Sequence, residues 1–206
     1  MFKFITEQMQ TIKLKDPSVK NTGEIFLHPG LWAIAAHRWS HRMYRRKHFF
    51  VARLVSMIAR FMTGIEIHPG AKIGRRLFID HGLGVVIGET TIIGNDVLIY
   101  QGVTLGGTGK DVGKRHPTIG SNVMVGAGVK VLGPVKIGDY VRIGAGSVVL
   151  HNVPAHSTAV GVPAKIVRRC GVKRVGDVLN QTQFPNIYAN ELNELKQRVD
   201  RMEKRL

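Results

Sequence analysis

The sequence predicts an α+β protein built on a parallel β-helix, with an N-terminal α-helical segment and a C-terminal helix. Three observations favour this fold class. An aliphatic residue recurs every six positions through the middle of the 206-residue chain, a glycine usually follows it, and the i, i+3, i+4, i+7 apolar spacing of a helix is absent there. The recurring aliphatic positions are Ile67, Ile73, Ile79, Ile87, Ile93, Ile99, Leu105, Ile119, Val125, Val131, Ile137, Ile143 and Val149.

The six-residue period has a direct structural meaning. Six residues make one short strand and one tight corner, and the aliphatic side chain anchors the strand on the inside. Three such units close a triangular coil of about 18 residues, and stacked coils pair their strands in parallel. Glycine next to the aliphatic residue, as at Gly74 and Gly94, allows a bend or a close approach of neighbouring backbones. The repeat therefore predicts a β-helix domain over residues 64–168.

The N-terminal segment, residues 1–63, lacks the six-residue period. Apolar and basic residues at helical spacing predict one helix over residues 33–48 and a second over residues 49–61. The sequence Asp16-Pro17-Ser18 indicates either a helix start, with proline at its first position, or a turn.

The C-terminal segment, residues 169–206, is expected to be a tail that ends in an amphipathic helix. Its apolar residues follow a 3-4-3-4 spacing at Leu192, Leu195, Val199, Met202 and Leu206. This spacing suits a short coiled coil, for which other copies of the chain could supply the partner helices. The alternative is a helix that packs on its own subunit.

The formal net charge of +16 is concentrated at the two ends of the chain. Residues 1–63 carry 11 Lys and Arg against 3 acids, residues 165–206 carry 10 against 5, and residues 64–164 carry 9 against 6. No zinc-finger spacing, helix-turn-helix pattern or aromatic-interleaved basic stripe accompanies this charge, so we expect no nucleic-acid partner. A solvated basic face is the simplest interpretation, and attraction of a polyanionic cofactor is the functional one.

The remaining composition indicates a cytoplasmic protein. The single cysteine, Cys170, excludes a disulfide framework and fits a reducing compartment. The N-terminal residues contain no apolar signal-peptide core. The most apolar helical stretch, residues 51–62, is too short for a membrane span and is interrupted by Arg53 and Arg60, so we expect no membrane segment.

The six-residue period is broken at two places. Within residues 79–87 two consecutive aliphatic positions are eight residues apart, so two residues are inserted at residues 80–84. Over residues 105–119 the separation is fourteen residues instead of twelve, and the glycine- and lysine-rich stretch 106–118 is predicted to be an extruded loop. Because regular coils form the scaffold of a solenoid, we expect the functional site at these irregular segments.

Two of the nine histidines lie in these irregular segments. His81 follows Asp80 and His116 follows Arg115, and each imidazole can face a cleft with a pKa suited to proton abstraction near neutrality. A carboxylate from Asp80 or Glu66 would fix the tautomer of such a base. The Arg115 guanidinium can pair with a substrate carboxylate. A purely structural role for His81 is the alternative.

Four stretches of this sequence resemble the serine acetyltransferase family. They read IDHGLGVVIGET at 79–90, QGVTLGGTG at 101–109, GKRHP at 113–117 and GVPA at 161–164. The resemblance covers about residues 14–170, and the DHG and KRHP elements together are specific to the family. It implies a left-handed β-helix of hexapeptide repeats that transfers an acetyl group from acetyl-CoA to the hydroxyl of L-serine, giving O-acetylserine for cysteine biosynthesis.

The resemblance also implies roles for individual residues. His81 is the general base, and Glu66, where many relatives have aspartate, is its orienting carboxylate. His116 is both a catalytic and a serine-binding residue; Arg115 binds the serine carboxylate, and an acid binds its ammonium group. Asp16 and Asp80 line the serine site. Small residues leave room for the pantetheine arm of acetyl-CoA at Gly106, Gly107, Ala127 and Ala145.

The family resemblance further implies a site between neighbouring subunits, and hence a homotrimer or a dimer of trimers. Feedback inhibition by cysteine is another family property. Relatives that dock into O-acetylserine sulfhydrylase typically end in isoleucine, whereas this chain ends in Leu206, which argues against that partner.

Two other kinds of enzyme are alternatives to a serine acetyltransferase. A hexapeptide-repeat O-acetyltransferase for a sugar or an antibiotic would keep the base histidine, but it would not need Asp16, Asp80 and Arg115 to hold an amino acid. A γ-class carbonic anhydrase-like protein would need three histidines around a metal. His151 and His156 have a spacing found in such enzymes, but they lie at the end of the repeat without a supporting Cys/His cluster, so we expect no metal.

Overall fold

The computed structural model describes residues 2–109, 112–169 and 187–203. Its helices are α1 (Phe2–Lys15), the 3-10 helix η1 (Glu24–Leu27), α2 (Pro29–Arg45), α3 (Phe49–Thr63) and α4 (Ile187–Glu203). The helices predicted over residues 33–48 and 49–61 correspond to α2 and α3. The sequence pattern had not indicated α1 by itself. Asp16 follows the last residue of α1, so the turn interpretation of Asp16-Pro17-Ser18 is right and the helix start is wrong.

The middle of the chain forms three sheets of very short strands, each sheet making one side of a triangular coil. Sheet A contains β1 (Glu66–Ile67), β4 (Val86–Ile87), β7 (Thr104–Gly106), β10 (Lys130–Leu132) and β13 (Val148–Val149). Sheet B contains β2 (Lys72–Ile73), β5 (Ile92–Ile93), β8 (Thr118–Ile119) and β11 (Lys136–Ile137). Sheet C contains β3 (Phe78–Ile79), β6 (Leu98–Ile99), β9 (Met124–Val125), β12 (Arg142–Ile143), β14 (Ser157–Val160) and β15 (Lys165–Arg169).

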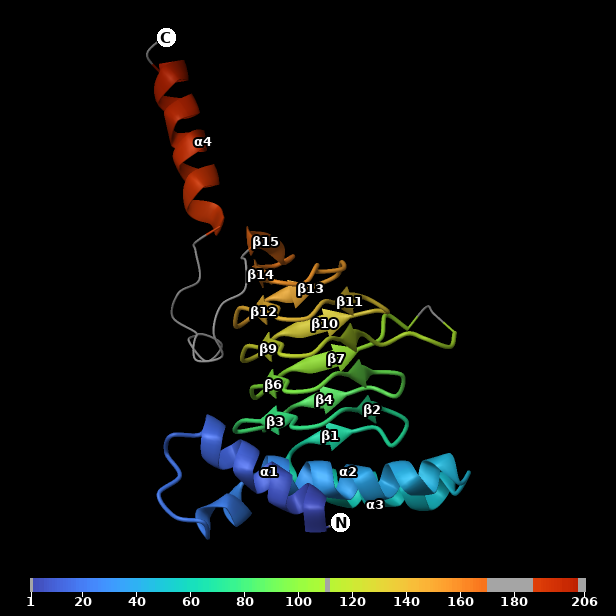
Figure 1. Ribbon diagram of the computed structural model, residues 1–206. Coiled ribbons are helices and arrows are strands. Elements are labelled where there is room, and N and C mark those ends of the chain that lie inside the picture. The colour runs from blue at the N-terminus through green and yellow to red at the C-terminus, as the bar shows by residue number, and fades with distance from the viewer. Residues whose placement is uncertain (1, 110–111, 170–186, 204–206) are drawn as a thin grey trace.

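Successive coils pair in parallel and in register, with Ile67 opposite Ile87 and Ile87 opposite Leu105 in sheet A. Among the described strands only β15 is antiparallel, and it pairs with β14 at the C-terminal end of the β-helix. Twelve of the thirteen recurring aliphatic residues are buried, and Ile73 is partly buried. The predicted left-handed β-helix with flanking helices is therefore confirmed (Figure 1). The division into units at residues 63 and 168 stays a prediction.

The N-terminal helices cover two parts of the β-helix. Helices α2 and α3 lie below β1 and close the first coil, where Ala33 and Ile34 join the internal core (Figure 1). On the outer side of sheet C, the residues next to the aliphatic anchors are apolar as well. They form a second buried cluster with the helical segment, made of Ile12, Ile25, Leu31, Phe78, Leu98 and Met124. This apolar contact directs the end of α1 toward the corner that follows β3.

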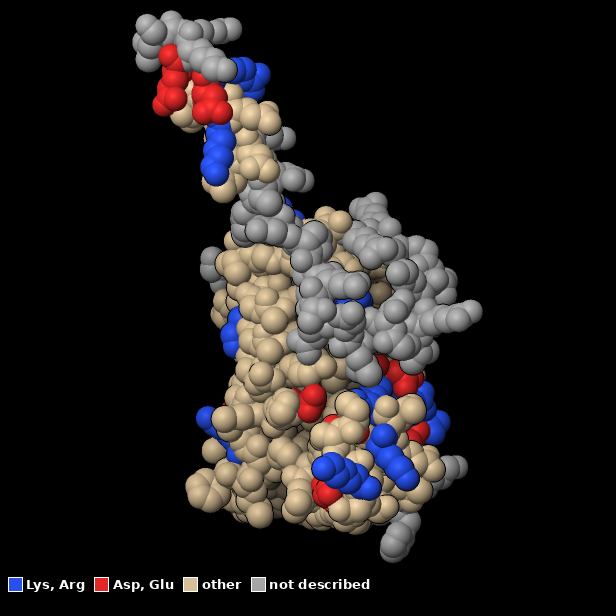
Figure 2. Space-filling model, turned by 90° about the vertical axis from the view of Figure 1, so that its left-hand side faces the viewer, with Lys and Arg blue, Asp and Glu red and all other residues tan. Residues whose placement is uncertain are grey.

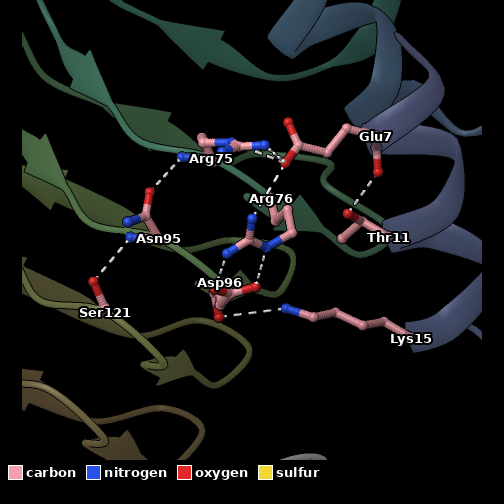
Figure 3. A network of polar contacts seen from close by, with 8 residues as sticks. All are labelled: Glu7, Thr11, Lys15, Arg75, Arg76, Asn95, Asp96 and Ser121. Atoms are coloured by element: carbon pink, nitrogen blue, oxygen red, sulfur yellow. Dashed lines mark hydrogen bonds and ion pairs between the residues drawn. The ribbon is translucent and has the colours of Figure 1, made fainter. Parts of the chain in front are cut away.

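A polar network fixes α1 on the first two coils (Figure 3). Arg76 donates two hydrogen bonds of 2.6 Å to the Asp96 carboxylate of the next coil and one of 3.2 Å to Glu7 on α1. Lys15 donates to the Asp96 carbonyl oxygen. The two-pronged pairing with Asp96 orients the Arg76 guanidinium, which in turn holds Glu7 and thereby α1. On the face in Figure 2, charged side chains of both signs gather over this lower half of the molecule.

No helix within the described ranges combines the length and the apolar character that a membrane crossing requires.

His37 on α2 provides a test of how this helix packs against the first coil of the β-helix. Its side chain is buried, its Nε2–H donates to the Ala71 carbonyl oxygen at 3.2 Å, and burial lowers its pKa from 6.5 to about 3. Below pH 6.5 the unfolded chain therefore binds a proton that the native chain excludes. His37 should thus reduce the free energy of unfolding by about 1.4 kcal/mol per pH unit as the pH falls from 6.5 toward 4.

We expect His37→Gln to remove this part of the pH dependence, measured by urea unfolding at a series of pH values. His151→Gln is the control, because His151 is exposed. If the free energy of unfolding depends equally on pH in the wild type and in His37→Gln, His37 takes up its proton in the native state.

Candidate active site

Except for Asp16, which follows α1, the predicted site residues lie on sheet A or at the two corners that flank it. The corner between sheets C and A, which we call the base corner, carries Asp80 and His81. The corner between sheets A and B, which we call the arginine corner, carries Arg115 and His116. Glu66 is on β1 of sheet A itself. The third corner, between sheets B and C, holds none of them.

At the base corner, the two inserted residues expel a histidine from the wall. His81 has a positive φ of 58°, a backbone conformation that non-glycine residues seldom adopt, and the following Gly82 has a φ of 76°. The His81 side chain is 74% exposed, and its Nε2 lies 3.9 Å from Asp80 Oδ1. The insertion thus gives an accessible imidazole with a carboxylate beside it.

A second carboxylate reaches the base corner from the end of α1. Asp16 lies 3.2 Å from His28 Nε2 and accepts a 2.8 Å hydrogen bond from the Ser18 backbone N–H. Burial alone would raise the pKa of Asp16, but the Ser18 hydrogen bonds and the nearby His28 and His81 outweigh it and lower the pKa. Asp16 is therefore ionised at neutral pH, and two carboxylates flank His81.

Glu66 has a different partner in the described chain. Its Oε2 lies 3.1 Å from Arg60 Nη1 of α3, and no hydrogen bond or ion pair joins it to His81 within the described residues. The orienting role of Glu66 therefore stays a prediction, and it would require the imidazole or the carboxylate to turn.

At the arginine corner, His116 is held as a neutral hydrogen-bond donor. The Thr90 backbone N–H donates to His116 Nδ1 at 3.2 Å, which leaves the ring proton on Nε2. The Thr90 hydroxyl lies 3.0 Å from the same nitrogen and accepts hydrogen bonds from the backbone N–H groups of Arg115 and His116. Burial and the charge of Arg115 lower the pKa of His116.

The His116 ring lies directly against the backbone of Gly88. A Cβ atom at this position would overlap the imidazole, so only glycine leaves enough space for the ring.

Arg115 is oriented by a chain of contacts that leads to α2. Its Nη2 donates to Glu89 Oε2 at 2.6 Å, and the Tyr44 hydroxyl donates to Glu89 Oε1 at 2.9 Å. The Tyr44 hydrogen bond is the main cause of the lowered pKa of Glu89, with further contributions from His68 and Arg115. The Arg115 side chain is 37% exposed and can still meet an anion.

The small residues predicted for the pantetheine arm divide between the two corners. Ala127 and Ala145 follow one another in successive coils at the base corner, where the Gly146 N–H donates to the Ala127 carbonyl oxygen. Gly107 lies at the arginine corner, where a Cβ would come within 3.2 Å of the Arg115 carbonyl oxygen, and Gly106 ends β7 beside it. At each corner, residues with charged or reactive side chains therefore lie beside small residues.

Several residues of the site could not be recognised from the sequence. They are Tyr44, Glu89 and Thr90 at the arginine corner and His28 at the base corner. They come from α2, from a regular corner of the repeat and from the turn before α2, so no local pattern marks them. His156, the candidate metal ligand paired with His151 in the sequence, stacks on Tyr140 with ring centroids 4.9 Å apart. In the described ranges no three His, Cys, Asp or Glu side chains are grouped as metal ligands would be.

The two corners together offer what an acyl transfer to an amino acid requires. The base corner supplies an exposed imidazole and two carboxylates, which can accept a hydroxyl proton and bind an ammonium group. The arginine corner supplies a guanidinium and an imidazole N–H, which can bind a carboxylate or a developing oxyanion. The width of sheet A separates these corners in a single chain.

Comparison with known proteins agrees with this chemistry. The family profile described as "Bacterial transferase hexapeptide (six repeats)" matches residues 116–151. A serine acetyltransferase from Bacillus licheniformis is 52% identical over 98% of this chain and 97% of its own length.

Solved structures give the same result. A Neisseria gonorrhoeae serine acetyltransferase in complex with serine is 41% identical, has a TM-score of 0.77 and aligns over 81% of this chain and 69% of that chain. A Brucella abortus serine acetyltransferase in complex with coenzyme A is 38% identical, has a TM-score of 0.79 and aligns over 84% of this chain and 69% of that chain. The chain thus belongs to the serine acetyltransferase family of hexapeptide-repeat transferases.

Proposed function

We propose that His81 is the general base of serine acetylation, that acetyl-CoA is the acetyl donor, and that each site is completed by a second copy of the chain. The observation that carries the proposal is the exposed His81 imidazole at an inserted corner, flanked by Asp16 and Asp80. The serine complex and the coenzyme A complex of related enzymes support the two substrates.

The proposed reaction needs no nucleophile from the protein. A nitrogen of His81 takes the proton of the serine hydroxyl as its oxygen attacks the thioester carbonyl carbon, and a tetrahedral oxyanion forms. When this intermediate collapses, the carbon–sulfur bond breaks, and the imidazolium returns the proton to the leaving thiolate. The neighbouring Asp80 carboxylate stabilises the imidazolium, and Glu66 is proposed to orient the ring.

The two corners bind opposite ends of serine in this proposal. Asp16 and Asp80 pair with the ammonium group and Arg115 with the carboxylate, which leaves the hydroxyl facing His81. Because the proton of His116 is on Nε2, this group acts as a hydrogen-bond donor to the carboxylate or the oxyanion. The pantetheine arm would follow the small residues at Gly106, Gly107, Ala127 and Ala145.

A homotrimer would bring the base corner of one copy to the arginine corner of the next across sheet A. Exposed apolar side chains on two helices support an assembly. Helix α3 exposes Phe50, Phe61 and Met62 at 80%, 92% and 78%. Helix α4 exposes Leu192, Leu195, Val199 and Met202 along one stripe. The α4 stripe suits a coiled coil of three copies, and the α3 face could join two trimers.

Some expectations concern residues outside the described ranges. Leu206 is one of them, so the argument against docking to O-acetylserine sulfhydrylase rests on sequence alone. Cys170 is another, and a reducing, cytoplasmic location is proposed from its being the single cysteine.

The base role is tested by His81→Asn. Loss of the proton acceptor should lower kcat with L-serine and acetyl-CoA about 100- to 10,000-fold, measured by release of the coenzyme A thiol. Circular dichroism and light scattering should show unchanged folding and assembly, because the side chain is exposed. His151→Asn, at another exposed histidine, should keep wild-type activity. Near-full activity of His81→Asn would contradict the proposed mechanism. If the wild-type enzyme acetylates sugars but not serine, the proposed acceptor is wrong.

The packing of the His116 ring against Gly88 is tested by Gly88→Ala. The added methyl group should displace the imidazole and lower kcat/KM for serine by about tenfold or more. The same substitution in a His116→Ala background should then have little further effect, because the methyl group fills space that the ring has left. Equal losses in both backgrounds would show that Gly88 acts independently of His116.

A further inference from the structure

A strongly basic cavity lies between α2 and the first strand of sheet B, beside residues 69–71, and none of its lining residues belongs to the proposed active site. Its volume is about 580 Å³. Its cationic lining residues are Arg38, Arg42, Arg45, Arg46 and Lys72. Ile73, the one incompletely buried residue of the aliphatic repeat, also borders this space. No carboxylate is among the lining residues.

The arginines of this cavity are concentrated on one face of α2. Their positions, 38, 42, 45 and 46, follow helical spacing, so like charges stand one turn apart and repel each other. Helix α2 has no acidic residue to offset them. Within the described residues, the side chains of Arg42, Arg45, Arg46 and Lys72 make no ion pair and no hydrogen bond. An anion with several charges would relieve this repulsion.

Two histidines of α2 also line the cavity. His37, 5% exposed, donates from Nε2 to the Ala71 carbonyl oxygen, and its Nδ1 is buried. His41 stacks on it at 5.5 Å and is fixed by the Pro69 carbonyl oxygen at 2.7 Å. The two rings therefore form a fixed wall of the cavity, and the groups that can meet an anion are the arginines and Lys72.

We propose that this cavity is a binding site for a phosphate-bearing anion, separate from the acetyl-CoA site. Its volume falls within the range of small-molecule sites and exceeds the needs of a single phosphate, so a diphosphate or a small phosphorylated compound fits it best. The cations bind the charged oxygens, and a diphosphate carries enough negative charge to meet several of them at once.

The test uses the full-length protein and sodium pyrophosphate, with binding measured by calorimetry at an ionic strength held constant with sodium chloride. We expect one saturable site per chain. Arg42→Gln/Lys72→Gln, which changes two exposed cavity residues, should weaken binding by about tenfold or more. Lys20→Gln/Lys136→Gln removes the same charge from exposed positions outside the cavity and should bind within about twofold of wild type.

Three results would overturn the proposal. The first is equal weakening in both double variants, which would mean that diffuse charge attracts the anion. The second is binding of sulfate as tight as that of pyrophosphate, which would show that the cavity does not prefer a phosphate-bearing anion with several charges. The third is loss of pyrophosphate binding when coenzyme A is saturating, together with weaker coenzyme A binding in Arg42→Gln/Lys72→Gln. This last result would assign the cavity to the phosphates of coenzyme A.

Discussion

The structure depends on one constraint, which is that the inward aliphatic residue of each coil must stack on that of the next. The pairing of Ile67 with Ile87 and of Ile87 with Leu105 keeps every strand in register with its neighbour. Extra residues within a strand would break this register and the stacking of the aliphatic residues, so they are placed at a corner. The extra residues at 80–84 leave the His81 side chain exposed. The longer break at 106–118 places Arg115 and His116 at the next corner. Scaffold and proposed site are thus two results of the same packing rule.

The same constraint explains why the two halves of the site are apart in one chain. Corners of a triangular coil are separated by a full strand, and the stacked coils do not bend to bring them together. The proposed base and the groups proposed to hold the serine carboxylate therefore face different directions from opposite edges of sheet A. A second copy is the simplest way to join them, because a symmetric assembly repeats one contact between unlike corners around an axis.

Much of the fold could be predicted from the sequence because the repeat is local. Each aliphatic residue and its glycine indicate one strand and one corner, so the thirteen positions predict the β-helix without any knowledge of tertiary contacts. Helix α1 was not recognised, since it is stabilised by contacts of residues such as Ile12 with Phe78 and Leu98 on sheet C, far along the chain. Asp16 could be placed in the site only by resemblance, because the packing of α1 on sheet C, and no local sequence pattern, brings Asp16 close to His81.

The site was predictable only where it interrupts the repeat. His81 and His116 were marked by the two breaks, whereas Glu89 and Thr90 sit in a regular corner and look like scaffold. Their function as supports for Arg115 and His116 depends on distances across 25 or 26 residues of sequence. Tyr44 is further away still, 45 residues from its partner Glu89. Single-sequence patterns do not carry such pairings.

Subunit complementation tests the central claim most directly. His81→Ala and Arg115→Ala/His116→Ala should each be nearly inactive alone. Co-expressed at equal levels, they should form mixed trimers in which about a quarter of the sites combine an intact base corner with an intact arginine corner, and activity should return to about that fraction of wild type. If the purified mixed trimers have no more activity than the separate variants, the catalytic groups work within one chain and the account is wrong.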